Sequence, residues 1–322
     1  MREVTVLRAG PLTTVQDQGR IGHRALGVSR GGALDLFAAQ IANLLVGNSV
    51  EVALLEVTLG GLRLRFEEAR FVAWCGGEFS VEMAGDRIPA GRRSVVRQGE
   101  ELRVESSGPG CRAWIAIAGE IETPIVLGSR STDLRSGFGG LKGRALRAGD
   151  ELSLGACSAP PPKAARVADW GAPEAWSHSA LRNPVLRVVR GTEWLEFTAE
   201  ARADFLNSPF TVSTKADRMG VRLKGVALRR LRNRELLSEA VAPGTVQVAH
   251  DGQPILLLGD CQTIGGYPKI GHVVTVDLAT AAQLQPNDVV RFQEVSLPDA
   301  ATLLIERTNE LERFRVGLQL HA

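Results

Sequence analysis

Polar side chains suited to binding or catalysis gather in one stretch of the chain, residues 236–270, where they alternate with short apolar runs. The runs Val246–Val248 and Ile255–Leu258 are typical of short strands. Glycines and a proline between them predict turns, at which backbone can approach a ligand closely. The donors, acceptors and titratable groups of the stretch are Gln247, His250, Asp251, Gln253, Asp260, Gln262, Thr263, Tyr267 and Lys269. We therefore expect the functional site at these turns.

Each candidate also has a purely structural interpretation, and the sequence leaves both open. Asp217 and Arg218 can form an ion pair across a turn, because structural pairs imitate sites. Gln247 stands between two valines on a strand and can satisfy neighbouring backbone. His250 lies beside Asp251 in a turn, which favours a solvated side chain over a catalytic one.

Length and charge exclude several classes of protein. At 322 residues the chain is long enough for two domains. Its 38 basic and 36 acidic residues are interspersed and leave a net charge of +2, which does not indicate a nucleic-acid or membrane partner. The arginine-rich run at 229–234 is interpreted as a solvated edge or a protein interface, because no aromatic residues interleave with it.

Targeting and metal-binding signals are missing from the sequence. The first ten residues lack the apolar core of a signal peptide, and no apolar run is long enough to span a bilayer, so we expect a cytoplasmic protein. The four cysteines and five histidines are scattered and show no metal-ligand spacing. No metal site is predicted.

Short alternating segments predict a mainly β chain with few helices. Turn residues separate the segments of residues 50–154 at intervals typical of a closed or sandwiched antiparallel sheet, and we expect a small barrel there. Helices are predicted at 35–46 and 198–206, after Asp277 up to Pro286, and from Pro298 onward. The domain prediction is a first domain at 1–155, a proline- and alanine-rich linker at 156–184, and a second domain at 185–322 with a C-terminal helix.

A glycine-rich segment with five basic residues, 128–150, connects two predicted strands of the first half. It is either an ordered functional loop or a mobile hairpin tip, and its length favours function. Arginine and lysine among glycines suit an anion, although no known phosphate motif is present.

Motifs in both halves carry a resemblance to a known family. They are TTVQDQGR (13–20), GGALD (31–35), the glycine-rich segment 128–150, ADRMGVRL (216–223), LLSE (236–239) and DCQTIGGYPKI (260–270). With these motifs the chain resembles subunit 2 of the allophanate hydrolase and urea amidolyase-related family, and the C subunit of 5-oxoprolinase is the most similar branch. The resemblance runs from about residue 4 to residue 296.

The resemblance implies two tandem cyclophilin-like β-barrel domains and a role in a complex. In 5-oxoprolinase, a subunit-1-like protein (the B type) and a third protein (the A type) complete an enzyme that uses ATP to open the lactam of 5-oxoproline to glutamate. The alternatives are a subunit of a biotin-dependent carboxyltransferase and a non-catalytic regulator that binds a subunit-1-like partner. The sequence contains neither an ATP-binding signature nor a biotin-attachment tripeptide, so another chain is expected to bring these groups.

Lactam opening needs a stabilised oxyanion, a positioned water and donors for the substrate carboxylate, which assigns roles to the candidates. The expected catalytic residues are Asp217, Arg218, Asp260, Gln262 and Tyr267. The expected substrate-binding residues are Gln247, Gln253, Thr263, Gly265, Gly266, Lys269, Gln16 and Arg20. Departures from the usual family pattern occur at Thr192, Glu193, Leu195, Ala216, Ala240, Ala249 and Ile264, and they put retention of the common substrate in question.

Overall fold

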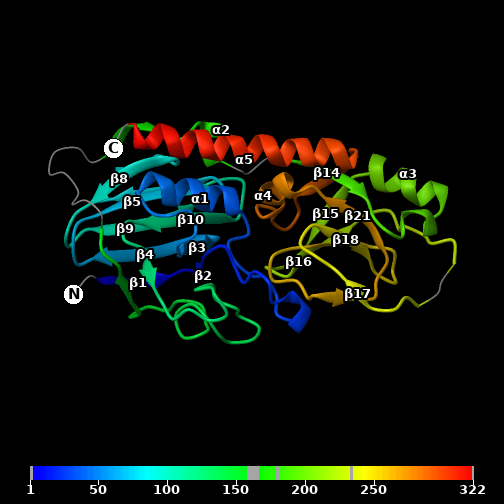
Figure 1. Cartoon of the computed structure of the whole chain (residues 1–322), viewed down its shortest axis with the longest axis horizontal. Helices are drawn as coiled ribbons and strands as arrows, with labels where there is room; N and C mark the ends of the chain where they lie inside the picture. Colours follow the sequence, from blue (N-terminus) through cyan, green and yellow to red (C-terminus); the bar gives the residue numbers. More distant parts are fainter. Residues whose placement is uncertain (1–2, 158–166, 179–181, 233–234, 321–322) are drawn as a thin grey trace. The chain divides into compact units, whose positions relative to one another are not determined.

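The computed structural model describes residues 3–157, 167–178, 182–232 and 235–320, and within it the chain forms two compact units (Figure 1). The first comprises residues 1–20, 31–180 and 311–322, and the second comprises 21–30 and 181–310. Residues 21–30 therefore belong to a different unit from their neighbours in sequence. The boundaries drawn from the sequence contain no such exchange.

The first unit is built from two sheets. The seven-stranded sheet has the spatial order β11 (Ile121–Glu122), β12 (Glu151–Leu154), β1 (Glu3–Ala9), β4 (Gly60–Phe66), β9 (Glu101–Ser106), β6 (Phe79–Met83) and β7 (Asp86–Arg87). The six-stranded sheet has the order β13 (Val167–Gly171), β8 (Arg92–Val96), β5 (Arg70–Gly76), β10 (Arg112–Ile117), β3 (Leu54–Thr58) and β2 (Leu12–Gln16). The pairings between the described strands of these sheets are antiparallel, as the spacing of turn residues predicts.

Alternation of side chains places the core of the first unit between these sheets. On β4, Leu62, Leu64 and Phe66 are fully buried, while the arginines between them face outward. Strand β10 is buried at every residue, because α1 (Leu36–Leu45) packs against it and against β5 on the face away from that core. Apolar burial on this scale is the main force that holds the two sheets together.

Helix α1 begins at Asp35, whose carboxylate accepts a hydrogen bond from Ala38 N at 2.9 Å, so the helix predicted at 35–46 is confirmed. Of the predicted linker 156–184, residues 158–166 and 179–181 lie outside the described residues. The rest includes β13, which pairs with β8, and α2 (Glu174–Ser177). The Trp176 ring of α2 packs edge-on against Phe37 and Phe314, with 5.8 Å between centroids in each pair, so this part of the linker docks on the first unit.

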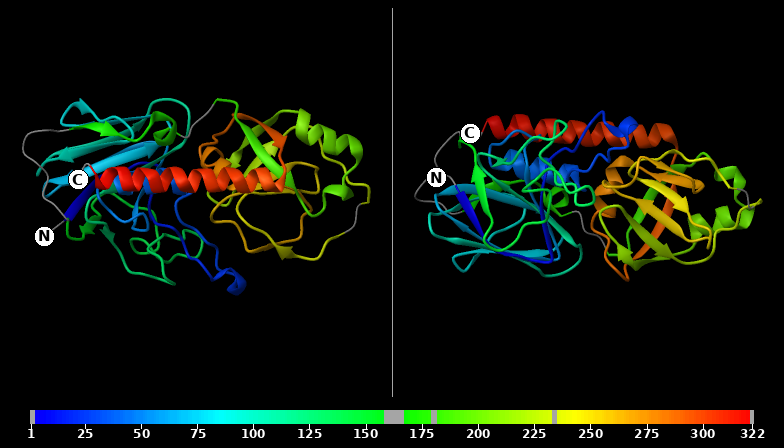
Figure 2. Two further views of the ribbon diagram at one scale, coloured as in Figure 1. Left: turned by 45° about the horizontal axis from the view of Figure 1, so that its top comes forward. Right: turned by 90° about the horizontal axis from the view of Figure 1, so that it is seen from below.

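The second unit is a closed seven-stranded barrel, which Figure 2 shows from two further directions. Its order is β14 (Val185–Arg190), β21 (Lys269–Val273), β18 (Thr245–Val248), β19 (Pro254–Leu257), β16 (Gly220–Lys224), β15 (Phe210–Ala216) and β22 (Val289–Glu294). The ring closes where β14 runs parallel to β22. A separate two-stranded sheet pairs β17 (Glu239–Ala240) with β20 (Ile264–Gly265). The predicted mainly β class is confirmed, and the closed barrel lies in the second unit.

An aromatic cluster fills the barrel beside α3 (Ala199–Asn207), which packs on β22. Phe205 of α3 stacks on Phe292 of β22 with 4.5 Å between ring centroids, and both side chains are buried. Thr198 caps the helix through Ala201 N, at the predicted start. Asp277, expected to cap a helix, instead binds Arg187, with its Oδ2 2.7 Å from Arg187 N.

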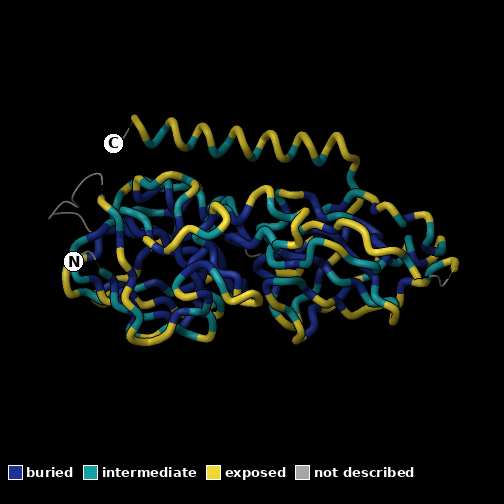
Figure 3. Tube along the Cα trace, turned by 60° about the horizontal axis from the view of Figure 1, so that its bottom comes forward, coloured by how far each residue is buried: buried dark blue, intermediate teal, exposed yellow. Residues whose placement is uncertain are grey.

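The remaining helical elements are short except for one. They are η1 (Arg24–Leu26), η2 (Trp194–Glu196), η3 (Thr275–Asp277), α4 (Leu278–Ala281) and α5 (Leu297–Gln319). Helix α5 has no buried residue along its 23 residues, as the colours of Figure 3 show. Among the described residues no helix is both long and apolar enough to cross a membrane.

Candidate functional site

A cleft of about 640 Å³ opens on the second unit where β18 and the β17–β20 sheet meet the segment after β16. Part of the stretch singled out from the sequence forms one wall. The lining residues are Ala227, Leu228, Arg229, Arg230, Glu235, Leu236, Gln247, Val248, Ala249, His250, Asp251, Gly252, Gln262, Gly265, Gly266, Tyr267 and Pro268. Five of the predicted site residues, Gln247, Gln262, Gly265, Gly266 and Tyr267, therefore come together here.

A chain of amides runs through this wall. Gln247 is almost fully buried on β18, and its Nε2 donates to the Tyr267 carbonyl oxygen at 3.2 Å. Its Oε1 lies 3.4 Å from Gln262 Nε2, at the long end of the hydrogen-bond range. Gln247 therefore satisfies backbone, as its structural interpretation has it, and at the same time holds a second amide in the cleft.

Gly265 gives the two amides their room. A Cβ atom built at this position would lie 2.7 Å from Gln247 Nε2 and 3.4 Å from Gln262 Nε2. The sequence suggested that Gly265 lets backbone approach a ligand; in the structure its missing side chain makes space for the amide pair.

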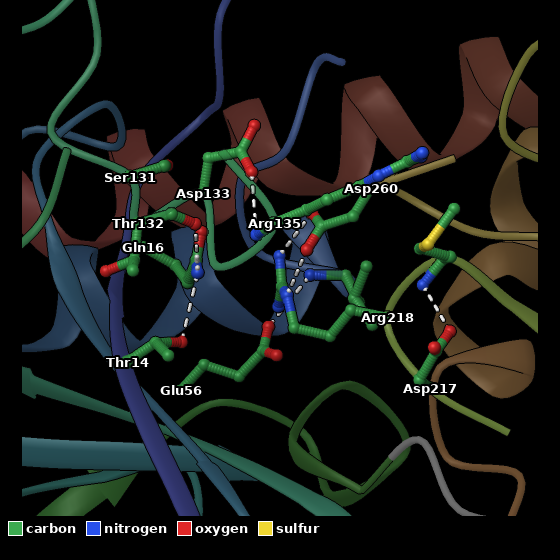
Figure 4. Close-up of polar contacts among 12 residues, drawn as sticks. Thr14, Gln16, Glu56, Ser131, Thr132, Asp133, Arg135, Asp217, Arg218 and Asp260 are labelled. Carbon is green, nitrogen blue, oxygen red and sulfur yellow. Dashed lines mark hydrogen bonds and ion pairs between the residues drawn. The ribbon is translucent and has the colours of Figure 1, made fainter. Parts of the chain in front are cut away.

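Arg218 and Asp260 form a buried ion pair, drawn in Figure 4. Arg218 Nε lies 2.8 Å from Asp260 Oδ2 and Arg218 Nη2 lies 3.0 Å from Asp260 Oδ1, so the contact is bidentate. The Arg218 side chain is 4% exposed and that of Asp260 11%. Neither residue lines the cleft.

The ion pair suggested between Asp217 and Arg218 is wrong, because Arg218 binds Asp260 instead. Asp217 Oδ1 accepts hydrogen bonds from Met219 N at 2.8 Å and Gly220 N at 3.2 Å, and so closes the turn between β15 and β16 (Figure 4). Its carboxylate acts on local backbone, as short acidic side chains in turns do.

Lys269, predicted to bind substrate, is a buried ammonium held by two carboxylates. Its Nζ lies 2.7 Å from Glu239 Oε2 and 3.3 Å from Glu193 Oε2, and its backbone N donates to the same Glu193 oxygen at 2.8 Å. Burial alone would lower the pKa of the amine, but the contacts with Glu239 and Glu193 outweigh it and raise the pKa above the ordinary lysine value. Glu193 is one of the departures from the family pattern, and in the structure its carboxylate binds Lys269.

Two further candidates of the second half lie outside the cleft. Gln253 spans Gly225: its Oε1 accepts from Gly225 N at 2.8 Å and its Nε2 donates to Gly225 O at 3.2 Å. Both ends of this amide serve backbone, beside a separate cavity of about 260 Å³. Thr263 is half-buried, and its carbonyl oxygen accepts from Val241 N.

The two first-half candidates belong to the first unit and stabilise its glycine-rich loop. Gln16 Nε2 donates to Thr14 Oγ1 at 3.0 Å and to Thr132 O at 3.2 Å (Figure 4). The Arg20 guanidinium donates to the Ser131 carbonyl oxygen at 2.5 Å and lies over the Phe138 ring, 4.5 Å from its centroid.

Asp17 anchors the same loop. Its carboxylate accepts from Ser129 Oγ at 2.6 Å, from Arg130 N at 2.5 Å and from Gly19 N at 2.8 Å. The segment 128–150 is therefore an ordered loop packed against β2, and a functional role for it stays a prediction.

Sequence reasoning missed two arginines that line the cleft. Arg229 and Arg230 line it, and Arg230 Nη2 lies 2.5 Å from Glu196 Oε2. Arg229 is exposed and makes no ion pair with any other described residue. Only their place in an arginine run marked them, and that run gives no sign of facing a cleft. His250 is exposed, as expected, and its ring packs edge-on against Tyr267 with 5.3 Å between centroids.

His272 provides a pH-sensitive contact on β21, where its Nδ1 lies 3.2 Å from Thr245 Oγ1. Burial, and then the charge of Lys269, lower its pKa below the ordinary histidine value. Below that ordinary value, about 6.5, the unfolded chain therefore binds a proton that the folded chain does not.

Stability should consequently fall as the pH is lowered from about 7 to about 5, and His272→Gln should flatten this dependence. The measurement is urea unfolding across that range, with exposed His250→Gln as the matched control. The same pH dependence in His272→Gln and the unsubstituted protein would refute this origin.

The described residues contain no group of three or more histidine, cysteine, aspartate or glutamate side chains placed to hold a metal ion. The cleft lining offers hydrogen bonding from amides and backbone, the charge of Arg229 and Arg230, and the side chains of Glu235, His250, Asp251 and Tyr267. Such a set binds and orients a polar ligand.

Comparison with known proteins shows relatives over nearly the whole chain. Residues 26–294 match the family described as carboxyltransferase domain, subdomain A and B. The C subunit of 5-oxoprolinase from Escherichia coli (strain K12) is 40% identical over 297 residues, which cover 92% of each protein. The urea amidolyase of Lachancea kluyveri is 27% identical over 334 residues, covering 97% of this chain and 18% of that protein.

Among solved structures, the K. lactis urea amidolyase superimposes with a TM-score of 0.89 at 29% identity. The match covers 97% of this chain and 20% of the K. lactis chain. The barrel, the sheets and the sequence motifs thus agree with one family. The chain belongs to the carboxyltransferase domain family, subdomains A and B, within the urea amidolyase-related proteins that its motifs resemble.

Proposed function

We propose that this chain is the C-type component of a cytoplasmic, ATP-dependent 5-oxoprolinase complex that opens the lactam of 5-oxoproline to give glutamate. The observation that carries the proposal is the 40% identity to the C subunit of a 5-oxoprolinase across 92% of both proteins. Its partners in the proposal are a subunit-1-like protein of the B type and a third protein of the A type, and activity depends on their presence.

The cleft offers groups for both ends of such a substrate. Gln262 faces it with an amide, which can hydrogen-bond a lactam, and Gln247 holds that amide in place. Arg229 faces it with a guanidinium that makes no ion pair among the described residues, and a guanidinium is suited to a carboxylate. We assign substrate contact to Gln262, Arg229, Gly265, Gly266 and Tyr267, and positioning of the Gln262 amide to Gln247.

The remaining candidates are assigned to positioning. Arg218 and Asp260 hold the turn before β16 against the turn after β19, because Asp260 N also donates to Arg218 O at 3.0 Å. Lys269, at the start of β21, binds Glu239 and so holds β17 near β21. Gln16 and Arg20 stabilise the first unit, and Asp217, Gln253 and Thr263 stabilise turns of the second.

The residues of the cleft do not fit ATP. A triphosphate requires several uncompensated cations or a cradle of backbone N–H groups. Here the two arginines of the lining are accompanied by Glu235 and Asp251, and Arg230 is already bound to Glu196. In the proposal ATP therefore binds on a partner, and no step of its chemistry is assigned to this chain.

The test is co-expression of this chain with the A-type and B-type proteins of its own organism, followed by assay of ATP-dependent glutamate release from 5-oxoproline. We expect turnover by the three-protein complex and none when this chain is omitted. A stable, correctly folded complex without turnover would refute the proposal and would favour the regulatory alternative.

A second candidate is a biotin-dependent carboxyltransferase subunit that acts on a urea-like or amide nitrogen. The superposition on K. lactis urea amidolyase, with a TM-score of 0.89, favours it. Three departures from the family pattern lie at or next to the cleft, where a substitution can change the substrate. Ala249 lines the cleft, and Ala240 pairs with Ile264 across the β17–β20 sheet. Bicarbonate- and biotin-carrier-dependent carboxylation of urea, without glutamate release, would select this candidate.

A further inference from the structure

The amide chain Tyr267–Gln247–Gln262 has a fixed direction. Amide oxygen and nitrogen atoms are normally assigned from their partners. Here the first partner is a backbone carbonyl oxygen, which only accepts, so Gln247 must present Nε2 to Tyr267 O and Oε1 to Gln262. Gln262 must in turn present its Nε2 to Gln247.

This direction determines what Gln262 offers to a ligand. One of its Nε2 hydrogens is donated to Gln247, which leaves the second Nε2 hydrogen and Oε1 of the same amide for a ligand. No further hydrogen bond occupies the Gln262 side chain among the described residues, and the residue lines the cleft. A ligand that complements this edge carries a hydrogen-bond acceptor next to a donor, in the reverse order.

We propose that Gln262 recognises the cis-amide edge of a lactam, accepting from its ring N–H at Oε1 and donating to its carbonyl oxygen through Nε2. Gln247 is the positioning residue that sets the orientation of this amide. A cyclic urea presents the same pair of N–H and carbonyl oxygen as a lactam. The choice of a lactam therefore rests on the proposed function. The inference adds to the proposed function the residue that distinguishes a lactam from a ring that has a carbonyl group but no N–H.

Two structural features support the assignment. Gln247 is 1% exposed, so its amide cannot turn over without leaving a buried donor and acceptor unsatisfied. Gly265 lies against both amides, and a methyl group there would displace the Gln247 amide by its contact with Nε2 at 2.7 Å. The pocket wall is thus shaped around the direction of the amide chain.

The experiment compares four probes on the full-length chain by ligand-observed NMR titration. The probes are 5-oxoproline, 2-pyrrolidone, 2-imidazolidinone and γ-butyrolactone, and the last of these keeps the ring carbonyl but lacks the N–H. We expect 2-pyrrolidone to bind about tenfold more tightly than γ-butyrolactone, because the lactone leaves Gln262 Oε1 unsatisfied. Gln262→Met should remove this preference.

Further variants separate recognition from folding. Gly265→Ala and Gln247→Met should also remove the lactam preference, because a Cβ at Gly265 meets both amides and Gln247 holds the Gln262 amide. Gln293→Glu changes an exposed glutamine of β22 outside the cleft and should be silent. A merely structural role would weaken both probes equally and leave their ratio unchanged.

The outcomes distinguish this inference from the proposed function. An unchanged ratio in Gln262→Met, or a tenfold preference for 2-imidazolidinone over 2-pyrrolidone, would overturn the inference even if the complex hydrolyses 5-oxoproline. A lactam preference that Gln262→Met removes would support it even if the complex shows no turnover, and the proposed function would then fail alone.

Discussion

Replacing Arg218 by alanine is expected to lower the free energy of unfolding by about 3–5 kcal/mol. Its guanidinium makes a bidentate contact with Asp260, and the two side chains are only 4% and 11% exposed. Removing one partner of a buried pair leaves the other charge without its counter-ion, and that residual charge causes most of the loss. Chemical denaturation of the full-length chain measures it.

The matched control is Arg315→Ala. Arg315 binds Glu312 with a comparable distance, 2.6 Å, but the side chains are 44% and 56% exposed. Solvent screens exposed pairs, so this variant should be close in stability to the unsubstituted protein. Equal stability of Arg218→Ala and Arg315→Ala would contradict the structural role, and loss of turnover in a fully stable Arg218→Ala would restore Arg218 to the catalytic residues.

The secondary structure could be predicted where local signals decide it. Asp35 and Thr198 are both good N-cap residues before apolar positions at helical spacing, and α1 and α3 begin at them. Alternation likewise located the strands of residues 50–154. Which strands join into which sheet depends on contacts between distant residues, so neither the two sheets of the first unit nor the place of residues 21–30 followed from these patterns.

The sequence predicted the stretch of chain in which the site lies, but not which of its side chains bind one another. Gln247, Gln262 and Tyr267 lie within about twenty residues of one another, and the turn chemistry between them was visible. Asp260 is 42 residues from Arg218, and the nearer Asp217 was the natural partner to suggest. Neighbours in sequence were favoured because distance through space is not encoded locally, whereas the barrel brings β16 next to β19.

Glu193 shows how a departure from a family pattern acquires a physical meaning. From the sequence it counted only as a departure from the usual family pattern. In the structure one of its oxygens accepts from both the backbone N and the Nζ of Lys269, 76 residues away. An acidic residue at this position compensates the buried ammonium, which an amide could not do.

Lys269→Met is therefore expected to lower the free energy of unfolding by about 3 kcal/mol. The substitution keeps much of the aliphatic stem but leaves the Glu193 carboxylate, 12% exposed, without its counter-ion. Adding Glu193→Gln to this variant should recover about 1–3 kcal/mol of the free energy of unfolding, because the buried charge is then removed. The amide oxygen at position 193 can still accept from the backbone N of residue 269. A double-mutant cycle by chemical denaturation measures this coupling.

Glu239→Gln serves as the control within the same contact, because Glu239 approaches the ammonium more closely, at 2.7 Å, yet is 62% exposed. Solvent screens that charge, so its loss should change stability by less than about 1 kcal/mol despite the shorter distance. Because the pKa of Lys269 is raised in the folded state, its contribution is complete at all pH values below the ordinary lysine pKa and disappears only as the pH rises through the folded value. A loss in Glu239→Gln as large as in Lys269→Met, or a coupling with Glu193 that vanishes at neutral pH, would show that burial does not decide the strength of this pair.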